Sequence, residues 1–147
     1  MTTRELRQYQ RDFIDFLVQS EALLLGDCVT KSGRNTPYFV NTGKFDTGEK
    51  ISRLSKFYAD HIMSLLAGKI DVIFGPAYKG IPLCVACAAA IHQHHNTSLR
   101  FVFDRKEAKD HGDKGKLVGS IHRGDRVLVI EDVITAGKKM LAEAAKA

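Results

Sequence analysis

Apolar residues recur at helical spacing near the start of the chain. The positions on this stripe are Leu6, Tyr9, Phe13, Phe16 and Leu17. Thr2 and Glu5 stand ahead of the stripe with the spacing of a capping box, in which two side chains satisfy backbone N–H groups of the first turn. The pattern therefore predicts a first helix that ends near residue 20.

A second helical stripe lies further along the chain. Its apolar positions are Ile51, Leu54, Tyr58, Ile62 and Leu65. Asp46 and Glu49 form another capping-box pair ahead of it, and Gly68 follows it as a typical helix stop. We therefore predict a helix between these two signals.

The remaining apolar residues form short continuous runs, which are typical of strands. These runs lie at 23–30, 38–40, 70–74, 99–103 and 126–130. The polar turn 31–37 joins the first two, and a predicted helix at about 81–95 separates the third from the fourth. Apolar runs that alternate with helices predict an α/β fold with a parallel sheet covered on both faces, and ligands bind beyond the carboxyl ends of such strands.

The composition fits one domain with one core. Of the 147 residues, 44% are hydrophobic and 27% are charged. No run approaches the roughly 18 consecutive apolar residues of a membrane span, and the N-terminus is polar where a secretory signal is apolar. Because no internal repeat or low-complexity linker interrupts the chain, we predict a single cytoplasmic domain over residues 1–147.

The cysteines and histidines do not require a disulfide or a zinc site. Cys84 and Cys87 lie in the small-residue apolar run 83–90, which is typical of a buried helix. Three histidines at 92–95 lack a second spaced pair of ligands, and a polar helix end explains them. We expect reduced thiols and assign no zinc.

Segment 127–138 carries the most informative chemical pattern. A buried strand leads into Glu131 and Asp132 and then into the small-residue turn 135–137. Backbone N–H groups at 135–139 can bind a phosphate at the positive end of a following helix. The two carboxylates suit vicinal sugar hydroxyls, which donate hydrogen bonds. A phosphate beside a diol indicates a ribose phosphate; the alternative is a structural strand with a solvated acidic end and a capped helix.

Two other segments can bind an anion. The turn 75–80 follows a predicted strand and contains Tyr78 and Lys79 between glycines. The densest group of cations lies on the predicted loop 105–116, in a chain whose net charge is +5. Taken alone, each segment could be an ordinary solvated turn.

These segments together resemble the type I phosphoribosyltransferases. Segment 127–138 resembles their motif for phosphoribosyl diphosphate (PRPP), with Lys138 in place of the usual Thr or Ser. Segment 105–112 closely resembles the signature of the orotate-specific branch, whose mobile loop closes over the diphosphate. Segment 31–39 resembles the part of orotate phosphoribosyltransferases that covers the base.

The resemblance implies an enzyme that transfers ribose 5-phosphate from PRPP to orotate, with Mg²⁺ held mainly by PRPP and no metal ligand assigned to the protein. The implied catalytic residues are Arg105, Lys106, Lys109 and His111. The implied PRPP-binding residues are Lys31, Tyr78, Lys79, Glu131, Asp132, Val133, Ile134, Thr135, Ala136, Gly137, Lys138 and Lys139. The implied orotate-binding residues are Lys31, Phe39 and Thr135.

The resemblance also carries expectations about architecture and partners. It implies a parallel sheet flanked by helices, with an N-terminal helix and hairpin hood at about 1–45 and a core at about 46–147. It implies a homodimer in which the loop closes on the neighbouring subunit, and no nucleic-acid or membrane partner. Because family members continue well beyond the phosphate turn, whereas this sequence stops ten residues after Gly137, we expect the C-terminal part to be missing, including an arginine that grips orotate's carboxylate.

Two alternative functions remain open. A phosphoribosyltransferase for another base would share the acidic pair but should lack segments 31–39 and 105–112. A non-catalytic regulator could sense PRPP with the same fold and bind nucleic acid with a basic helix face. Such a regulator is disfavoured because the cations of this chain concentrate in the predicted loop.

Overall fold

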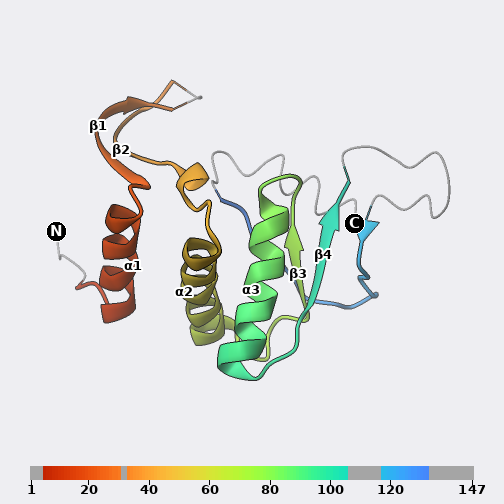
Figure 1. Cartoon of the computed structure of the whole chain (residues 1–147). Coiled ribbons are helices and arrows are strands. Elements are labelled where there is room, and N and C mark those ends of the chain that lie inside the picture. The colour runs from red at the N-terminus through yellow and green to blue at the C-terminus, as the bar shows by residue number, and fades with distance from the viewer. Residues whose placement is uncertain (1–4, 31–32, 106–116, 133–147) are drawn as a thin grey trace. The chain divides into compact units, whose positions relative to one another are not determined.

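The computed structural model describes residues 5–30, 33–105 and 117–132. The chain divides into two compact units, Met1–Phe57 and Tyr58–Ala147, and Figure 1 labels their helices and longer strands. The predicted single domain, with its hood at about 1–45 and core at about 46–147, stays a prediction.

The first unit begins with α1 (Gln8–Gln19), which ends where the sequence pattern predicts. Its start differs, because the cap is built from Arg7 and Gln10: the Arg7 N–H donates to Gln10 Oε1 at 2.9 Å. Glutamine serves here as glutamate does in a capping box, since its side-chain oxygen accepts a hydrogen bond. Glu5 precedes the helix, and Thr2 lies outside the described residues.

Phe16 is the centre of the core of this unit, with 1% of its surface exposed. Its ring stacks on that of Phe45 with 5.4 Å between centroids, and it contacts Phe57 at 5.5 Å. The guanidinium of Arg53 lies 4.8 Å from the centroid of the Phe16 ring, where the ring quadrupole attracts a cation. Phe16 of α1 thus contacts Phe45, which precedes the next long helix, and also contacts Arg53 and Phe57, which lie within that helix.

A hairpin of β1 (Leu23–Val29) and β2 (Asn35–Val40) follows, and its strands pair antiparallel. The two strands confirm the prediction, although β2 begins three residues earlier than its apolar run. Leu24 pairs with Phe39, and Leu25 with Tyr38. These four side chains are all exposed, so the hairpin adds little to the buried core. A short 3-10 helix, η1 (Thr42–Lys44), ends this region.

The next helix, α2 (Gly48–Leu66), matches the second predicted stripe. Its cap is Thr47, whose Oγ1 accepts a hydrogen bond from the Lys50 N–H at 3.2 Å. The prediction that Asp46 caps this helix is therefore wrong. Asp46 forms an ion pair with the Lys50 side chain at 3.0 Å. The prediction for Leu65 is also wrong: it is 50% exposed, while Leu66, four residues after a buried isoleucine, packs against the core.

The second unit contains a four-stranded sheet in the order β5-β4-β3-β6. The strands are β3 (Val72–Gly75), β4 (Arg100–Asp104), β5 (Leu117–Val118) and β6 (Val127–Val129). β3 pairs parallel with β4 on one side and with β6 on the other, as predicted. The short β5, which the sequence pattern did not predict, pairs antiparallel with β4. The described sheet is therefore mixed, with three parallel strands.

Helices cover one face of this sheet. In Figure 1, α3 (Gly80–His95) runs alongside β3. It packs against β3 and β4 and, with the second half of α2, on Ile73 and Ile130. Cys84 and Cys87 are buried in this layer, which confirms the core interpretation, and burial raises the pKa of Cys84 to about 11 and that of Cys87 to about 12. No described helix is both long and apolar enough to span a membrane.

The opposite face has its own apolar cluster. Val72, Phe74 and Val102 are at most 1% exposed there, and Leu117 and Ile121 pack against them. We predicted helices on both faces. Within the described residues, α2 and α3 pack on the other face, whereas β5 and the segment after it supply the contacts of this one.

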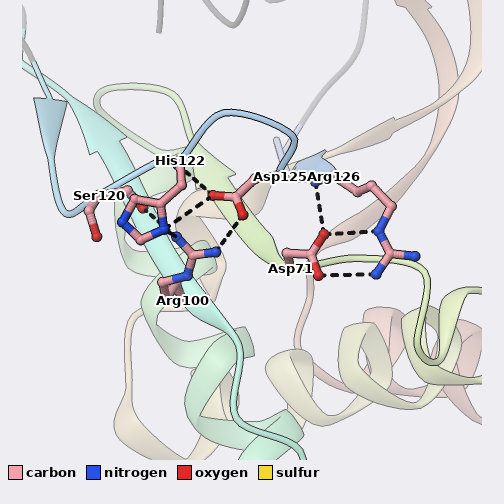
Figure 2. Close-up of polar contacts among 6 residues, drawn as sticks. All are labelled: Asp71, Arg100, Ser120, His122, Asp125 and Arg126. Atoms are coloured by element: carbon pink, nitrogen blue, oxygen red, sulfur yellow. Dashed lines mark hydrogen bonds and ion pairs between the residues drawn. The ribbon is translucent and has the colours of Figure 1, made fainter.

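Aspartates and arginines join the strands at their amino ends (Figure 2). Both oxygens of Asp71 accept from the Arg126 guanidinium, at 2.9 and 3.0 Å. Beside this pair, Arg100 donates to Asp125 at 2.6 Å. Arg100 also lies 2.7 Å from His122 Nδ1, and because a guanidinium can only donate, this nitrogen is the acceptor. These contacts fix the starts of β3, β4 and β6 relative to one another.

Lowering the pH should weaken the Asp71–Arg126 pair in a defined range. Hydrogen bonds from Arg126 are the main cause that lowers the pKa of Asp71 to about 2, from an ordinary 3.8. Because the folded-state pKa is depressed, the stabilisation is fully present above the ordinary value and is lost as the pH falls towards 2. Asp71→Asn should therefore lower the urea midpoint at about pH 6, and this deficit should shrink towards pH 2.

Arg126→Gln provides the matched control, because it breaks the same pair from the other side. Its deficit in urea midpoint should shrink over the same pH range. A deficit of constant size in both variants would show that the pair is not the source of the acid sensitivity.

Candidate functional site

The three parallel strands end at one edge of the sheet, and each delivers polar groups there. β3 leads into the turn 75–80, β4 ends at Asp104, and β6 leads through Ile130 to Glu131 and Asp132. The Ile130 N–H donates to the Phe74 carbonyl at 2.9 Å, which extends the β3–β6 ladder up to the acidic pair. The predicted anion turn and the predicted sugar carboxylates therefore belong to adjacent strands.

Two glycines allow the turn after β3 to return directly into α3. A Cβ on Gly75 would overlap the Gly80 carbonyl oxygen and lie 2.6 Å from Cys84 Sγ, and a Cβ on Gly80 would lie 2.7 Å from Pro76 Cδ. Both contacts are closer than a methyl group tolerates. The close approach brings the first turn of α3 against the end of β3, and the Ala77–Tyr78 peptide bond within the turn is cis.

Lys79 and Asp132 connect the turn to the acidic pair. Lys79 Nζ lies 3.0 Å from Asp132 Oδ2, with 68% of the lysine side chain and 11% of the aspartate side chain exposed. The Asp132 N–H donates to Glu131 Oε1 at 3.1 Å. The result is an aspartate that is largely shielded from water, next to Glu131 and beside a cation that is largely open to water. Such a pair can accept hydrogen bonds from hydroxyl groups while the ammonium attracts an anion.

Tyr58 lies close enough to this pair to feel its charge, and the sequence did not reveal this. Burial is the first cause that raises the pKa of Tyr58, and the negative charges of Asp132 and Glu131 raise it further. From its spacing on α2 we assigned Tyr58 only to the apolar stripe. Its side chain does pack against the core, so the stripe position did not reveal that the acidic residues influence its pKa.

Asp104 is a second residue that sequence reasoning missed. Its Oδ1 accepts a 2.6 Å hydrogen bond from the Ala77 N–H, across 27 positions of sequence. From the sequence we assigned no role to Asp104, which lies between the predicted strand 99–103 and the predicted loop 105–116. Only its place directly after the buried run could have drawn attention to it.

The other predicted site residues are distributed as follows. Tyr78 is 64% exposed on the turn, Arg105 follows β4 with intermediate exposure, and Phe39 lies on β2 of the first unit, 48% exposed. The remaining predicted residues lie outside the described residues: Lys31, Lys106, Lys109, His111, Val133, Ile134, Thr135, Ala136, Gly137, Lys138 and Lys139.

Comparison with known proteins now adds to this geometry. The sequence profile named "Phosphoribosyl transferase domain" matches residues 43–144, which is most of the chain. The chain belongs to this family. Both compact units contribute to the match. The described four-stranded sheet lies within it, together with the carboxyl ends of the parallel strands.

Curated relatives of this phosphoribosyltransferase domain include enzymes named for orotate. The orotate phosphoribosyltransferase of Clostridium acetobutylicum is 49% identical over 133 residues, which make up 90% of this chain and 59% of the relative. That of Yersinia enterocolitica is 48% identical over 132 residues. The resemblance to orotate phosphoribosyltransferases is thus confirmed, and the chain spans about three fifths of the length of these relatives.

Solved structures agree with the fold. The crystal structure of the orotate phosphoribosyltransferase from Francisella tularensis has a TM-score of 0.77 and 38% identity, with 92% of this chain and 63% of that chain covered. The α/β phosphoribosyltransferase fold predicted from the sequence is therefore confirmed.

The close approach in the turn makes a direct prediction about stability. Gly75→Ala should destabilise the second unit by about 1–3 kcal/mol, because the new methyl group meets backbone that cannot move without separating β3 from α3. The loss is measured as a shift of the urea unfolding curve.

Gly48→Ala is the matched control, since a Cβ there meets nothing within 4 Å. We expect it to leave the curve unchanged or to raise the midpoint slightly. If the two substitutions shift unfolding equally, the close approach between Gly75 and Gly80 is not what holds the turn.

Proposed function

We propose that this protein is an orotate phosphoribosyltransferase. The ring nitrogen of orotate attacks the anomeric carbon of PRPP, the bond from that carbon to diphosphate breaks, and orotidine 5-phosphate and diphosphate result. The observation that carries the proposal is the Lys79–Asp132 contact, because it joins a lysine turn and an acidic pair at one sheet edge. The similarity to relatives named orotate phosphoribosyltransferase supports the choice of base.

In this proposal the acidic pair binds the ribose. Asp132 and Glu131 accept hydrogen bonds from the two ring hydroxyls, whose O–H groups donate. The low exposure of Asp132 supports this role, since a shielded carboxylate forms stronger hydrogen bonds than one in bulk water. The backbone of residues 133–139 receives the 5-phosphate, and Lys138 adds a cation where the family has a hydroxyl.

Lys79 and Tyr78 act on the diphosphate. The Lys79 side chain is mostly exposed, and a single ion pair at such a position stabilises a protein little. A magnesium diphosphate can therefore draw the ammonium away from Asp132, and that carboxylate can then accept hydrogen bonds from the ribose hydroxyls. Binding of the diphosphate half of PRPP therefore favours binding of the ribose half, and the reverse also holds.

The loop and the base contacts complete the proposed site. Arg105, Lys106, Lys109 and His111 stabilise the charge that grows on diphosphate as it leaves, in a homodimer whose loop closes on the neighbouring subunit. The contacts to orotate are Lys31, Phe39 and Thr135. These assignments rest on the sequence resemblance and stay predictions.

Magnesium fits this edge as an ion held mostly by substrate. Within the described residues no group of three or more His, Cys, Asp or Glu side chains could hold a metal, and Mg²⁺ commonly keeps water and phosphate oxygens as ligands. Glu131 and Asp132 are the oxygen donors nearest to the proposed position of PRPP. When bound, the ion would neutralise charge on the diphosphate.

The direct test is turnover of orotate. The protein is mixed with PRPP and Mg²⁺ and with either orotate or adenine, and the release of diphosphate is followed in both mixtures. We expect consumption of orotate only. The same assay on a chain extended by the C-terminal part of the Clostridium acetobutylicum relative measures whether the additional length is needed for rate.

Each other outcome has a distinct meaning. Turnover of adenine without orotate would make the protein a phosphoribosyltransferase for another base. PRPP binding by both forms without turnover of either base would favour the non-catalytic sensor. Absence of both binding and turnover in the extended chain would contradict the proposed function.

Replacing the buried carboxylate should weaken PRPP binding without unfolding the protein. Asp132→Asn loses a charged acceptor for a ribose hydroxyl, so the Kd for PRPP measured by calorimetry should rise by about tenfold. The far-ultraviolet circular dichroism should stay unchanged.

Asp125→Asn is the matched control, because Asp125 is similarly shielded, with 12% of its side chain exposed, and is also paired with a cation. It lies at the opposite edge of the sheet, so the substitution should leave PRPP affinity unchanged. Equal loss of affinity in both variants would assign the effect to general destabilisation.

A further inference from the structure

The turn after β3 is held from both neighbouring strands. On the β6 side, Lys79 contacts Asp132 at 3.0 Å. On the β4 side, Asp104 Oδ1 accepts the Ala77 N–H at 2.6 Å. β3 lies between these two strands in the sheet, so the two contacts leave the turn in opposite directions. One is made by a side chain and the other by the backbone.

The position of Asp104 needs an explanation, because a carboxylate repels the anion that this turn is proposed to bind. Its contact with Ala77 provides one. The amides that open α3 are used inside the turn: Gly80 N–H donates to the Pro76 carbonyl at 3.0 Å, and Ile81 N–H to the Tyr78 carbonyl at 3.3 Å. The bond to Asp104 is thus a backbone contact that ties the beginning of the turn to another strand.

The two contacts differ in what a ligand does to them. The ammonium of Lys79 can exchange Asp132 for a diphosphate oxygen, because its side chain is long and mostly exposed. The Ala77 N–H is already saturated by a carboxylate, and charge-assisted hydrogen bonds are among the stronger ones in proteins. This contact can remain in place while the other is broken.

We propose that Asp104 is a positioning residue that holds the backbone of the β3–α3 turn in the shape that binds diphosphate. The inference rests on the proposed function and deepens it. Asp104 supports binding of the diphosphate half of the substrate without contacting the diphosphate itself. Asp104 also immediately precedes Arg105, so the same bond fixes the point at which the predicted loop 105–116 begins after β4.

Binding of substrate fragments tests this role. Calorimetry with magnesium diphosphate and with ribose 5-phosphate is performed on the unaltered chain, Asp104→Ala and Asp104→Asn. Asp104→Ala should weaken diphosphate binding by roughly tenfold and leave ribose 5-phosphate binding unchanged, because only the diphosphate contacts the turn. Asp104→Asn should restore most of the affinity, since its amide oxygen can still accept the Ala77 N–H.

Asp71→Ala is the matched control. Asp71 also accepts a backbone N–H from a neighbouring strand, that of Arg126 at 2.9 Å, but at the amino ends of the strands. It should lower stability without changing diphosphate affinity. Exchange of the Ala77 amide proton, followed by NMR, gives a readout that needs no ligand: exchange should be faster in Asp104→Ala and close to normal in Asp104→Asn.

The outcomes separate this inference from the proposed function. Normal diphosphate affinity in a folded Asp104→Ala variant would overturn the role of Asp104 and leave the proposed function intact. An unaltered chain that binds neither fragment would count against the proposed function. In that case the exchange rate of the Ala77 amide proton still tests Asp104. An unchanged rate in Asp104→Ala would overturn the role of Asp104, and a faster rate would support its role in positioning the turn.

Discussion

Burial of β3 between two parallel neighbours is the constraint on which the rest of the second unit depends. Val72, Ile73 and Phe74 are at most 1% exposed, and each pairs with a residue of β4 on one side and of β6 on the other. Because β3 has apolar contacts on both faces and hydrogen bonds along both edges, its ends are fixed. The turn after β3 therefore leaves the sheet at one defined point, between the ends of its two neighbours.

The two edges of this sheet use charge in different ways. At the amino ends, guanidinium groups bind Asp71 and Asp125, and the forked geometry of arginine makes such contacts specific and lasting. At the carboxyl ends, a flexible lysine pairs with Asp132 and stays largely exposed. A point charge on a long side chain can change partners at little cost. One edge thus fixes the strands, and the other is suited to exchange an internal carboxylate for a ligand.

The sequence alone determined the order and type of most elements and the chemical nature of the site. Apolar runs and stripes predicted the helices and the parallel strands because burial of one face follows directly from side-chain spacing. Cys84 and Cys87 were placed in the core for the same reason. The acidic pair and the Lys79 turn could be recognised because each is a continuous segment in which carboxylates or glycines directly follow an apolar strand. Motifs of this kind are local, and local patterns can be read from one chain.

Contacts between distant segments were decided only by the tertiary structure. Thr47 rather than Asp46 caps α2, and the sequence offered both as adjacent acceptors ahead of the same helix. Tyr58 was assigned only to the apolar stripe because side-chain spacing describes burial and not the charges of Asp132 and Glu131 that help to raise its pKa. Asp104 reaches Ala77 across 27 positions, and no spacing rule in the sequence relates a residue at the end of β4 to one in the turn after β3. The sequence could name candidate site residues such as Lys79 and Asp132, because each lies in a continuous motif. A contact such as that between Asp104 and Ala77 is defined by pairing in space, which only the folded sheet provides.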